Sequence, residues 1–395
     1  MVTVVQKYGG SSVADVSRIR RVAEAVVARK RAGDRMVVVV SAMGKTTDAL
    51  IAQAREVTPD PPRRELDMLV TAGERIAMAL LSMAIQDLGE SAISFTGSQS
   101  GIITDENHQG ARILEVRPIR IPEELDKGRI VIVAGYQGVS RQREITTLGR
   151  GGSDTTAVAL ASALNADACE IYSDVDGVYT ADPNLCPQAQ LLKELRYETM
   201  QAMAGAGAKV LNADAVEFAR RAGIVIEARK TGDASGRQTQ IKTSAHEPSG
   251  VVAVVGANVV TRLVGPKLAV SQLVEELSRF GGRIMALLID AGLDLLVDRT
   301  GIPGKEHATL IRLAAEHGLE ARAVGVVTLV GSGMLTRPGV WQGIEASLAS
   351  TGVRPQTWLG SDLTHSVVIE VTQVDGLVKA LHAQLIEAEL NRSRS

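Results

Sequence analysis

The stretch Thr146-Thr-Leu-Gly-Arg-Gly-Gly-Ser-Asp-Thr-Thr156 decides the fold, because it connects two elements of different kinds. Residues 129–134 before it form a Val/Ile run, which predicts a buried strand, and the alanine- and leucine-rich residues 157–165 after it predict a helix. Three glycines in four residues give the connecting backbone access to conformations that are closed to other residues. Freed backbone N–H groups and the positive end of a helix together form an anion site.

Polar side chains in the same loop suit a charged substrate. Arg150 carries the planar fork that matches a carboxylate or a phosphate. Asp154 adds a negative charge that can hold a metal ion or a lysine, and either Ser153 or Asp154 is expected to cap the helix. The loop therefore predicts a reaction centre, with an ordinary tight turn as the alternative.

Composition favours a soluble enzyme of about two or three domains. The 395 residues are 45% hydrophobic and 22% charged, with a net charge of −2. No long basic run is present and only 3% of the residues are aromatic, so nucleic acid is a poor partner. Cys169 and Cys186 lack a metal-type spacing and are expected to be packing residues. Residues 1–7 predict a strand rather than a signal peptide, and no apolar run reaches bilayer length, so we expect a cytoplasmic protein without a membrane partner.

The N-terminal region repeats the order of strand, glycine loop and helix. A β-branched run over 2–5 leads into Lys7-Tyr-Gly-Gly-Ser-Ser-Val13, and the apolar residues between Val16 and Val27 then fall on one helical face. A lysine in front of a Gly-Gly-Ser loop predicts a phosphate cradle, and a plain turn of the same composition is equally open.

Two further polar positions follow. The apolar run 36–40 predicts a strand that leads into Ser41-Ala-Met-Gly-Lys-Thr-Thr47; a P-loop is excluded because Val39 stands where that motif requires glycine. Residues 66–81 predict a helix with Gly73-Glu74-Arg75 inside it. A glycine inside a helix lowers its stability by about 1 kcal/mol relative to alanine. That loss is tolerable if another backbone segment or a ligand must approach the helix closely at this position. Glu74 then points at a cationic group, unless it is a solvated helix glutamate.

Strands that alternate with helices predict a mostly parallel open sheet with helices on both faces. Ligands bind such sheets at the carboxyl ends of the strands. The polar loops all begin at such ends, at Lys7, Ser41, Thr96, Gly135 and Asp174. The last loop, Asp174-Val-Asp-Gly-Val-Tyr-Thr-Ala-Asp-Pro183, carries three carboxylates that suit Mg²⁺ or a ribose.

Together these motifs resemble those of the aspartate kinases, within the amino acid kinase superfamily, and look closest to the actinobacterial type. The resemblance covers about residues 1–210 and rests on Lys7-Tyr-Gly-Gly-Ser-Ser12, Thr71-Ala-Gly-Glu-Arg75, Phe95-Thr-Gly-Ser-Gln-Ser-Gly101, Gly135-Tyr-Gln-Gly138, residues 146–154 and residues 172–183. It implies an α/β amino acid kinase fold followed by two α+β, ferredoxin-like ACT domains.

The resemblance also implies a reaction and its residues. ATP, with Mg²⁺, would phosphorylate the side-chain carboxylate of L-aspartate to 4-phospho-L-aspartate, a step of amino-acid biosynthesis or of a specialised aspartate-semialdehyde pathway. Lys7 and Asp154 would be catalytic. Aspartate would be bound by Ser41, Thr47, Glu74, Arg150 and Ser153. ATP would be bound by Lys7, Tyr8, Gly9, Gly10, Ser173, Asp174, Tyr179, Asp182, Lys209 and Val210. No metal ligand is assigned.

The chain departs from the family pattern at two places near the expected nucleotide. Asn184 stands where the family commonly has arginine after Asp-Pro, and Asn212-Ala-Asp214 replaces a basic or His-Pro element. Both changes remove positive charge. Two alternatives to a working aspartate kinase therefore stay open: a regulatory paralogue with impaired catalysis, and a kinase for another carboxylate such as acetylglutamate.

The polar residues 231–248 predict a connection between domains. We expect a catalytic domain over 1–245, a first ACT domain over 250–325 and a second over 326–395. The ACT domains are indicated by a weak β-α-β-β repeat of about 70 residues, and residues 331–340 resemble the second ACT domain of aspartate kinases. Such domains commonly pair between subunits, so self-association, at least to a dimer, is implied.

The first ACT domain is divergent. Family members carry an acidic turn before its helix and an Asn-Ile/Val-Asp stretch after it, where lysine or threonine binds; the corresponding places here read Val264-Gly-Pro-Lys267 and Gly282-Arg-Ile-Met285. Lys267 and Arg283 would repel an effector's ammonium group. We therefore expect weak feedback inhibition, unless Asp290 or Asp294 reaches the pocket from a neighbouring strand.

Overall fold

The computed structural model describes residues 2–149, 151–208, 210–233, 235–266, 270–279, 281–289, 292–302 and 307–388, which form two compact units. Unit 1 comprises Met1–Val178, Lys193–Tyr197 and Val210–Ala245, and unit 2 comprises Tyr179–Leu192, Glu198–Lys209 and His246–Ser395. Two segments that the predicted boundaries assign to the catalytic domain therefore belong to unit 2. The three-domain division stays a prediction.

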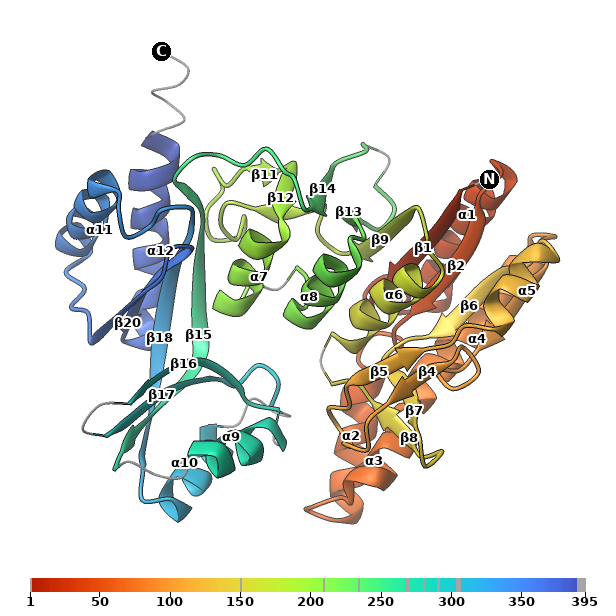
Figure 1. Ribbon diagram of the computed structural model, residues 1–395, viewed down its shortest axis with the longest axis horizontal. Helices are drawn as coiled ribbons and strands as arrows, with labels where there is room; N and C mark the ends of the chain where they lie inside the picture. The colour runs from red at the N-terminus through yellow and green to blue at the C-terminus, as the bar shows by residue number, and fades with distance from the viewer. Residues whose placement is uncertain are drawn as a thin grey trace. The chain divides into compact units, whose positions relative to one another are not determined.

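Unit 1 is built on an eight-stranded sheet with the order β12-β14-β13-β9-β1-β2-β6-β3 (Figure 1). The strands are β1 (Thr3–Tyr8), β2 (Arg35–Val40), β3 (Ala92–Phe95), β6 (Ile130–Ala134), β9 (Ala168–Ser173), β12 (Glu194–Arg196), β13 (Ile226–Lys230) and β14 (Gln238–Lys242). Every neighbouring pair is parallel except β13 and β14. The chain leaves β1 toward β2 on one side and later returns to its other side as β9. The topological switch point, where ligands bind open sheets of this kind, therefore lies between β1 and β9.

Helices cover both faces of this sheet (Figure 1). The helices that contact its strands are α1 (Val16–Arg31), α4 (Ala72–Asp87), α5 (Arg120–Asp126) and α6 (Gly152–Ala163). The other helices of unit 1 are α2 (Thr46–Val57), α3 (Arg63–Val70), which contacts β8, and α8 (Ala213–Ala222). Helices α1 and α4 share a hydrophobic cluster with alternate residues of β1, β2 and β6, including Ile19, Leu81 and Ile132. Helix α6 contacts β1, β2 and β9 and packs beside α8. Strand β6 is buried throughout, as parallel strands are when both faces are covered.

A second sheet of unit 1 has the order β5-β4-β7-β8. Its strands are β4 (Ile102–Thr104), β5 (Ile113–Val116), β7 (Gln137–Ser140) and β8 (Ile145–Thr147). Strand β8 leads directly into the glycine-rich stretch. The sequence analysis does not predict this sheet, because strands of three or four residues carry too little periodicity to be distinguished from loops.

Two expectations about unit 1 are wrong in detail. The helix expected over 66–81 is two helices, α3 and α4, that meet at Thr71, whose carbonyl accepts a hydrogen bond from Gln137 Nε2 (3.2 Å). The connection expected over 231–248 contains β14, in which Thr239 and Ile241 alternate into the core. The expected fold class, a mostly parallel α/β sheet with a separate α+β region, is confirmed.

The stretch Arg63–Asp87, which spans α3 and α4, is long and apolar enough to cross a membrane by length and composition. Core helices pass the same test, and half of its most apolar window (50%) is buried inside the protein. Asp67 and Glu74, both buried within unit 1, lie in this stretch. We therefore interpret α3 and α4 as core helices.

Unit 2 is built on a six-stranded antiparallel sheet with the order β16-β17-β15-β18-β20-β19. Its elements are β10 (Val178–Tyr179, at the unit boundary), β11 (Leu191–Leu192), most of α7 (Tyr197–Ala206), β15 (Val251–Gly265), α9 (Val270–Arg279), β16 (Arg283–Ile289), β17 (Leu293–Asp298), α10 (His307–Glu316), β18 (Glu320–Gly331), α11 (Pro338–Thr351), β19 (Thr357–Gly360), β20 (Thr364–Ile369), the 3₁₀ turn Val371–Gln373, α12 (Val374–His382) and the π-helical turn Ala383–Glu387. The long strands β15 and β18 pair with each other. Helices α9 and α10 pack in one cluster and α11 and α12 in another, so two α+β modules share these central strands.

Glu170 of β9 is a buried carboxylate between the unit 1 sheet and α1. Its Oε1 accepts from Arg29 Nη1 (2.9 Å), and its Oε2 accepts from Gln6 Nε2 (2.7 Å) and Tyr172 Oη (3.0 Å). The Glu170 side chain is 2% exposed. Removing one partner of a buried ion pair leaves the other charge without compensation.

We predict that Glu170→Gln lowers the free energy of unfolding by about 1–2 kcal/mol, below the range of about 3–5 kcal/mol for a broken buried pair, because Arg29 is partly exposed and keeps its ion pair with Asp34 (2.7 Å). Urea denaturation measures the change. Glu24→Gln, at an exposed position of α1, is the matched control and should change it by less than about 0.5 kcal/mol. Equal effects of the two substitutions would contradict the role of Glu170.

Candidate active site

The predicted ligand loops leave the same edge of the unit 1 sheet. Strands β1, β2, β3, β6 and β9 run parallel, and each ends immediately before or within one of these loops. The carboxyl ends of these strands therefore bring the lysine loop, the Ser41 loop and the Asp174 loop to one edge, as the sequence predicts.

An ion pair joins the lysine loop to the glycine-rich stretch. Lys7 Nζ lies 2.7 Å from Asp154 Oδ1, and the two side chains are 12% and 10% exposed. Lys7 lies at the end of β1, and Asp154 lies in the first turn of α6. Opposite charges attract more strongly when water is largely excluded, so this contact fixes one element against the other.

The glycine-rich loop adopts the left-handed backbone that its composition predicts. Gly149 and Gly151 have φ values of 76° and 72°. Gly151 is the N-cap of α6, so the expectation that Ser153 or Asp154 caps this helix is wrong. Ser153 instead lies in the first turn, packed so closely on Gly135 that a Cβ there would lie 2.7 Å from Ser153 Oγ. A glycine cap supplies no side-chain acceptor, which leaves the helix end suited to an anion.

The loops after β1, β2 and β9 pack backbone against backbone at the switch point. The Gly9 N–H donates to the Tyr172 carbonyl (3.2 Å), and the Gly44 N–H donates to the Gly10 carbonyl (3.0 Å). A Cβ on Gly10 would lie 2.9 Å from the Ala42 carbonyl oxygen, closer than real side chains come. Glycine is therefore required here for space rather than for a special φ.

A hydroxyl pair that the sequence analysis missed extends this contact to β13. Ser12 Oγ and Thr231 Oγ1 lie 2.6 Å apart, and the Thr231 N–H donates to the Ser173 carbonyl (3.0 Å). Thr231 directly follows β13. A hydroxyl residue at the end of a parallel strand is a sign of a ligand loop, but the polar composition of residues 231–248 predicts a linker instead.

Glu74 is buried at the start of α4. Glu74 is only 3% exposed, so the alternative of a solvated helix glutamate is wrong. Oε1 accepts from the Ala42 N–H (3.1 Å), whereas Oε2 has no hydrogen-bond partner among the described residues. Burial raises the pKa of Glu74 to about 7, against the opposing effect of its backbone hydrogen bonds. Gly73 permits this approach, because a Cβ there would lie 2.7 Å from Ala42 Cβ.

The other predicted residues have simpler surroundings. Ser41 follows β2, and Thr47 lies in the first turn of α2. Tyr8 is buried and stacks on Tyr172 with ring centroids 4.8 Å apart. The remaining residues divide as follows: Ser173, Asp174 and Val210 lie in unit 1, Tyr179 and Asp182 lie in unit 2, and Arg150 and Lys209 lie outside the described residues.

The two departures from the family pattern have local structural roles. Asn212 is the N-cap of α8, with Oδ1 accepting from the N–H groups of Asp214 (2.8 Å) and Ala215 (3.3 Å). Its side chain also packs against Gly151 of the glycine-rich loop. Asn184 donates from its backbone N–H (2.9 Å) and from Nδ2 (3.0 Å) to Asp182 Oδ1, so it closes a turn.

Comparisons with known proteins identify the family. Residues 2–227 match the model of the amino acid kinase family. The aspartokinase of Mycolicibacterium smegmatis is 44% identical over 409 residues, and that of Corynebacterium glutamicum is 42% identical over 412 residues; each alignment covers 97% of this chain and 96% of the relative. The chain belongs to the aspartokinase family. The expected resemblance, actinobacterial members included, is thus confirmed. The aspartokinase fold also appears in E. coli aspartokinase III in complex with aspartate and ADP, with a TM-score of 0.83 at 23% identity and coverage of 97% and 99%.

The raised pKa of Glu74 predicts a stability that depends on pH. At low pH the carboxyl is protonated in both states; as the pH rises from 4.5 to about 7 the unfolded chain ionises first, so the ligand-free aspartokinase loses stability. Over this range the free energy of unfolding falls by about 3 kcal/mol. Glu74→Gln should remove this loss, so that the variant becomes more stable than the parent by that amount at pH 8.

Urea denaturation of both proteins between pH 4.5 and pH 8 measures the effect. Glu56→Gln, at an exposed position of α2, is the control and should follow the parent. Parallel stability curves for the parent and Glu74→Gln would show that Glu74 is not held in a desolvated state.

Proposed function

We propose that this aspartokinase transfers the γ-phosphoryl group of ATP to the side-chain carboxylate of L-aspartate, with Lys7, Glu74 and Asp154 at the centre of the site. Membership of the family gives the activity, an ATP-dependent phosphotransferase of the aspartate kinase type. The observation that carries the assignment of roles is the Lys7–Asp154 ion pair, which lies between two glycine loops at the switch point of the sheet.

In the proposed mechanism the phosphates of ATP lie on the loop of Gly9 and Gly10, beside Lys7. An oxygen of the aspartate side-chain carboxylate attacks the γ-phosphorus and forms the new P–O bond. The bond from the γ-phosphorus to the bridging oxygen breaks, and ADP leaves with its electron pair. Such a reaction depends on positioning and charge neutralisation. Lys7 supplies the charge, and Asp154 orients it. A carboxylate is already ionised at neutral pH, so no general base is required.

We assign aspartate to Glu74 and the glycine-rich loop. The ammonium group of aspartate would pair with Glu74 Oε2, the buried oxygen without a partner among the described residues. Arg150, by its residue type, suits the α-carboxylate, and Ser41, Thr47 and Ser153 would line the pocket. Acetylglutamate has no ammonium group and would leave Glu74 Oε2 without a partner, so aspartate is the better substrate.

The nucleotide is assigned to the switch point of unit 1, with Ser173, Asp174 and Val210 beside the base and ribose. The roles of Tyr179, Asp182 and Lys209 stay predictions from the family resemblance. The described residues contain no group of three side chains that fits a metal ion. Mg²⁺ usually binds phosphate oxygens, water and one or two carboxylates, and Asp154 and Asp174 suit that role. The ion would supply shielding of phosphate charge.

Three further assignments complete the proposal. Asn212 and Asn184 have structural roles, and Lys7, Glu74 and Asp154 are intact, so we favour an active enzyme over an impaired regulatory paralogue. We propose that the ACT modules of unit 2 associate between two copies of the chain. The buried free thiols of Cys169 and Cys186 suit a reducing compartment, and we propose a cytoplasmic location.

Trapping of the acyl phosphate with hydroxylamine tests the proposed function. With ATP and Mg²⁺, L-aspartate should give a hydroxamate, whereas L-glutamate and acetylglutamate should give little. Absence of aspartyl hydroxamate at high enzyme concentration would overturn the proposal. If hydroxamate formed mainly from acetylglutamate, acetylglutamate rather than aspartate would be the substrate.

We predict that Lys7→Ala lowers kcat by at least about 100-fold, the scale of losing one preorganised charge at a transition state. Lys127→Ala is the matched control, because the Lys127 side chain is 58% exposed and pairs with Glu124 on α5, away from the predicted site residues. Steady-state kinetics of both variants measure the effect. An increase of the KM for ATP at unchanged kcat would contradict the role of Lys7.

We also predict weak inhibition by lysine and threonine. Arg283 Nη2 donates to Asp298 Oδ2 (2.9 Å), and Arg262 donates to both oxygens of Asp294 (2.9 and 2.6 Å), so these acids are already paired. Lys267 and Asp290 lie outside the described residues. Inhibitors typically couple to a site by about 1–3 kcal/mol, and without an acid for the ammonium group most of that is lost. Titration of each amino acid in the hydroxamate assay should show half-inhibition above about 1 mM, and a lower value would contradict the prediction.

A further inference from the structure

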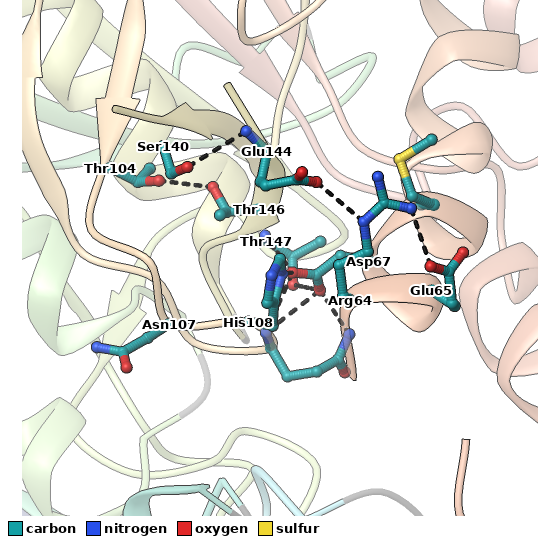
Figure 2. A network of polar contacts seen from close by, with 12 residues as sticks. Arg64, Glu65, Asp67, Thr104, Asn107, His108, Ser140, Glu144, Thr146 and Thr147 are labelled. Atoms are coloured by element: carbon teal, nitrogen blue, oxygen red, sulfur yellow. Dashed lines mark hydrogen bonds and ion pairs between the residues drawn. The ribbon is translucent and has the colours of Figure 1, made fainter. Parts of the chain in front are cut away.

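The core helices of unit 1 contain a second buried carboxylate, Asp67, that the proposed reaction does not use. Asp67 lies in α3, is 0% exposed and faces donors from two loops (Figure 2). Its Oδ1 accepts from Thr147 Oγ1 and from Gln109 Nε2, each at 2.6 Å, and its Oδ2 lies 2.7 Å from His108 Nδ1. Backbone N–H groups of Gln109 (3.2 Å) and Thr147 (3.3 Å) complete the set.

These donors lie where the glycine-rich loop begins. Thr147 is the last residue of β8, and Gly149 follows one residue later. The other donor loop lies against the same glycine, because a Cβ on Gly149 would lie 3.7 Å from Gly110 Cα and 3.9 Å from the Gln109 carbonyl oxygen. Asp67 therefore binds Thr147, just before the glycine-rich loop, and also binds Gln109, in the segment that packs against that loop.

Gln109 is in a conformation that needs this support. Its φ is 67°, in the left-handed region that residues other than glycine rarely adopt. Such strain persists where the surroundings hold it, and it is concentrated at functional sites. Asp67 binds both the backbone N–H and the side-chain amide of Gln109, so it is the group that holds this conformation.

Asp67 also belongs to the element that leads to Glu74. The Thr71 N–H donates to the Asp67 carbonyl (3.2 Å) at the point where α3 ends and α4, with Glu74 in its first turn, begins. The carboxylate thus ties the helix of Glu74 to the loop that leads to Ser153 and Asp154. A displacement of about 1 Å between reacting groups can cost about 100-fold in rate.

We propose that Asp67, together with His108, is a positioning residue that sets the glycine-rich loop against Glu74 for binding aspartate. This inference rests on the proposed function, because it takes both Glu74 and the loop to contact aspartate. The ATP phosphates are assigned to the loop after β1, whose backbone donates a hydrogen bond to Tyr172 of β9 and accepts one from Gly44 in the loop after β2. Loss of the Asp67 contacts should therefore raise the KM for aspartate far more than the KM for ATP, whose site the glycine-rich loop reaches indirectly, through the Asp154–Lys7 ion pair.

The Thr147 hydroxyl gives the sharpest test. Thr147→Val keeps the shape and removes one donor to Asp67, whereas Thr147→Ser keeps the donor. Thr146→Val is the matched control: it removes a buried hydroxyl from the neighbouring residue of the same strand, one that pairs with Thr104 Oγ1 (2.6 Å) and not with Asp67 (Figure 2). Asp67→Asn removes the charge itself.

We expect Thr147→Val to raise the KM for aspartate by about 10-fold and Asp67→Asn to lower kcat/KM for aspartate by about 100-fold, with the KM for ATP within about 2-fold of the parent. Thr147→Ser should restore the parent KM for aspartate, and Thr146→Val should leave it unchanged. A merely structural role would instead lower the melting temperature and the active fraction, with both KM values unchanged, and would overturn the proposal. If the parent chain forms no aspartyl hydroxamate, the proposed function fails; if it does and Thr147→Val and Asp67→Asn keep its KM for aspartate, only the positioning role fails.

Discussion

The arrangement of the active site depends on the ion pair between Lys7 and Asp154. It joins the end of β1 to the first turn of α6. Strand β1 precedes one glycine loop, and α6 follows the other. Two charges that are 12% and 10% exposed recover from each other only part of what their removal from water costs, so a gain in stability explains the pair poorly. The proposed reaction explains it better. In the proposed mechanism, a lysine already held by a carboxylate would present a fixed positive charge where negative charge develops, with no rearrangement at the moment of transfer.

Two buried carboxylates on neighbouring helices illustrate the difference between positioning and binding. Asp67 is surrounded by side-chain and backbone groups of His108 and Gln109 and of Thr147 at the end of β8, so both of its oxygens have partners within the protein. Glu74 has one accepted hydrogen bond on Oε1 and a buried Oε2 without a partner among the described residues, and burial raises its pKa to about 7. A group that the protein leaves incompletely paired gains most from a ligand of opposite charge. This contrast supports Glu74 as a binding residue and Asp67 as a support.

The sequence predicted those parts of the site that depend on regular elements. Apolar strands such as β2 and β6 carry strong patterns. Because parallel strands end at one edge, the loops of Lys7, Ser41 and Asp174 could be brought together without coordinates. Contacts that depend on short strands were not predictable. Strand β8 has three residues, and the Asp67 cluster joins residues that are 41 and 80 positions apart. The cap of α6 was predicted wrongly because Ser153 and Asp154 suit a cap by residue type, whereas one faces Gly135 and the other faces Lys7.

The charged residues of the first ACT module differ from Glu74 in that they are paired with one another. At the sequence level, Arg283 stands where an acidic group would receive an effector, and it looks like an unbalanced charge. In the fold, Arg283 pairs with Asp298, which is 5% exposed, and Arg262 pairs with Asp294 through two hydrogen bonds. An effector that paired its ammonium group with either of these acids would have to displace an arginine and leave it without its partner. Asp294 and Asp298 are thus satisfied within the protein, the reverse of the state in which Glu74 is kept.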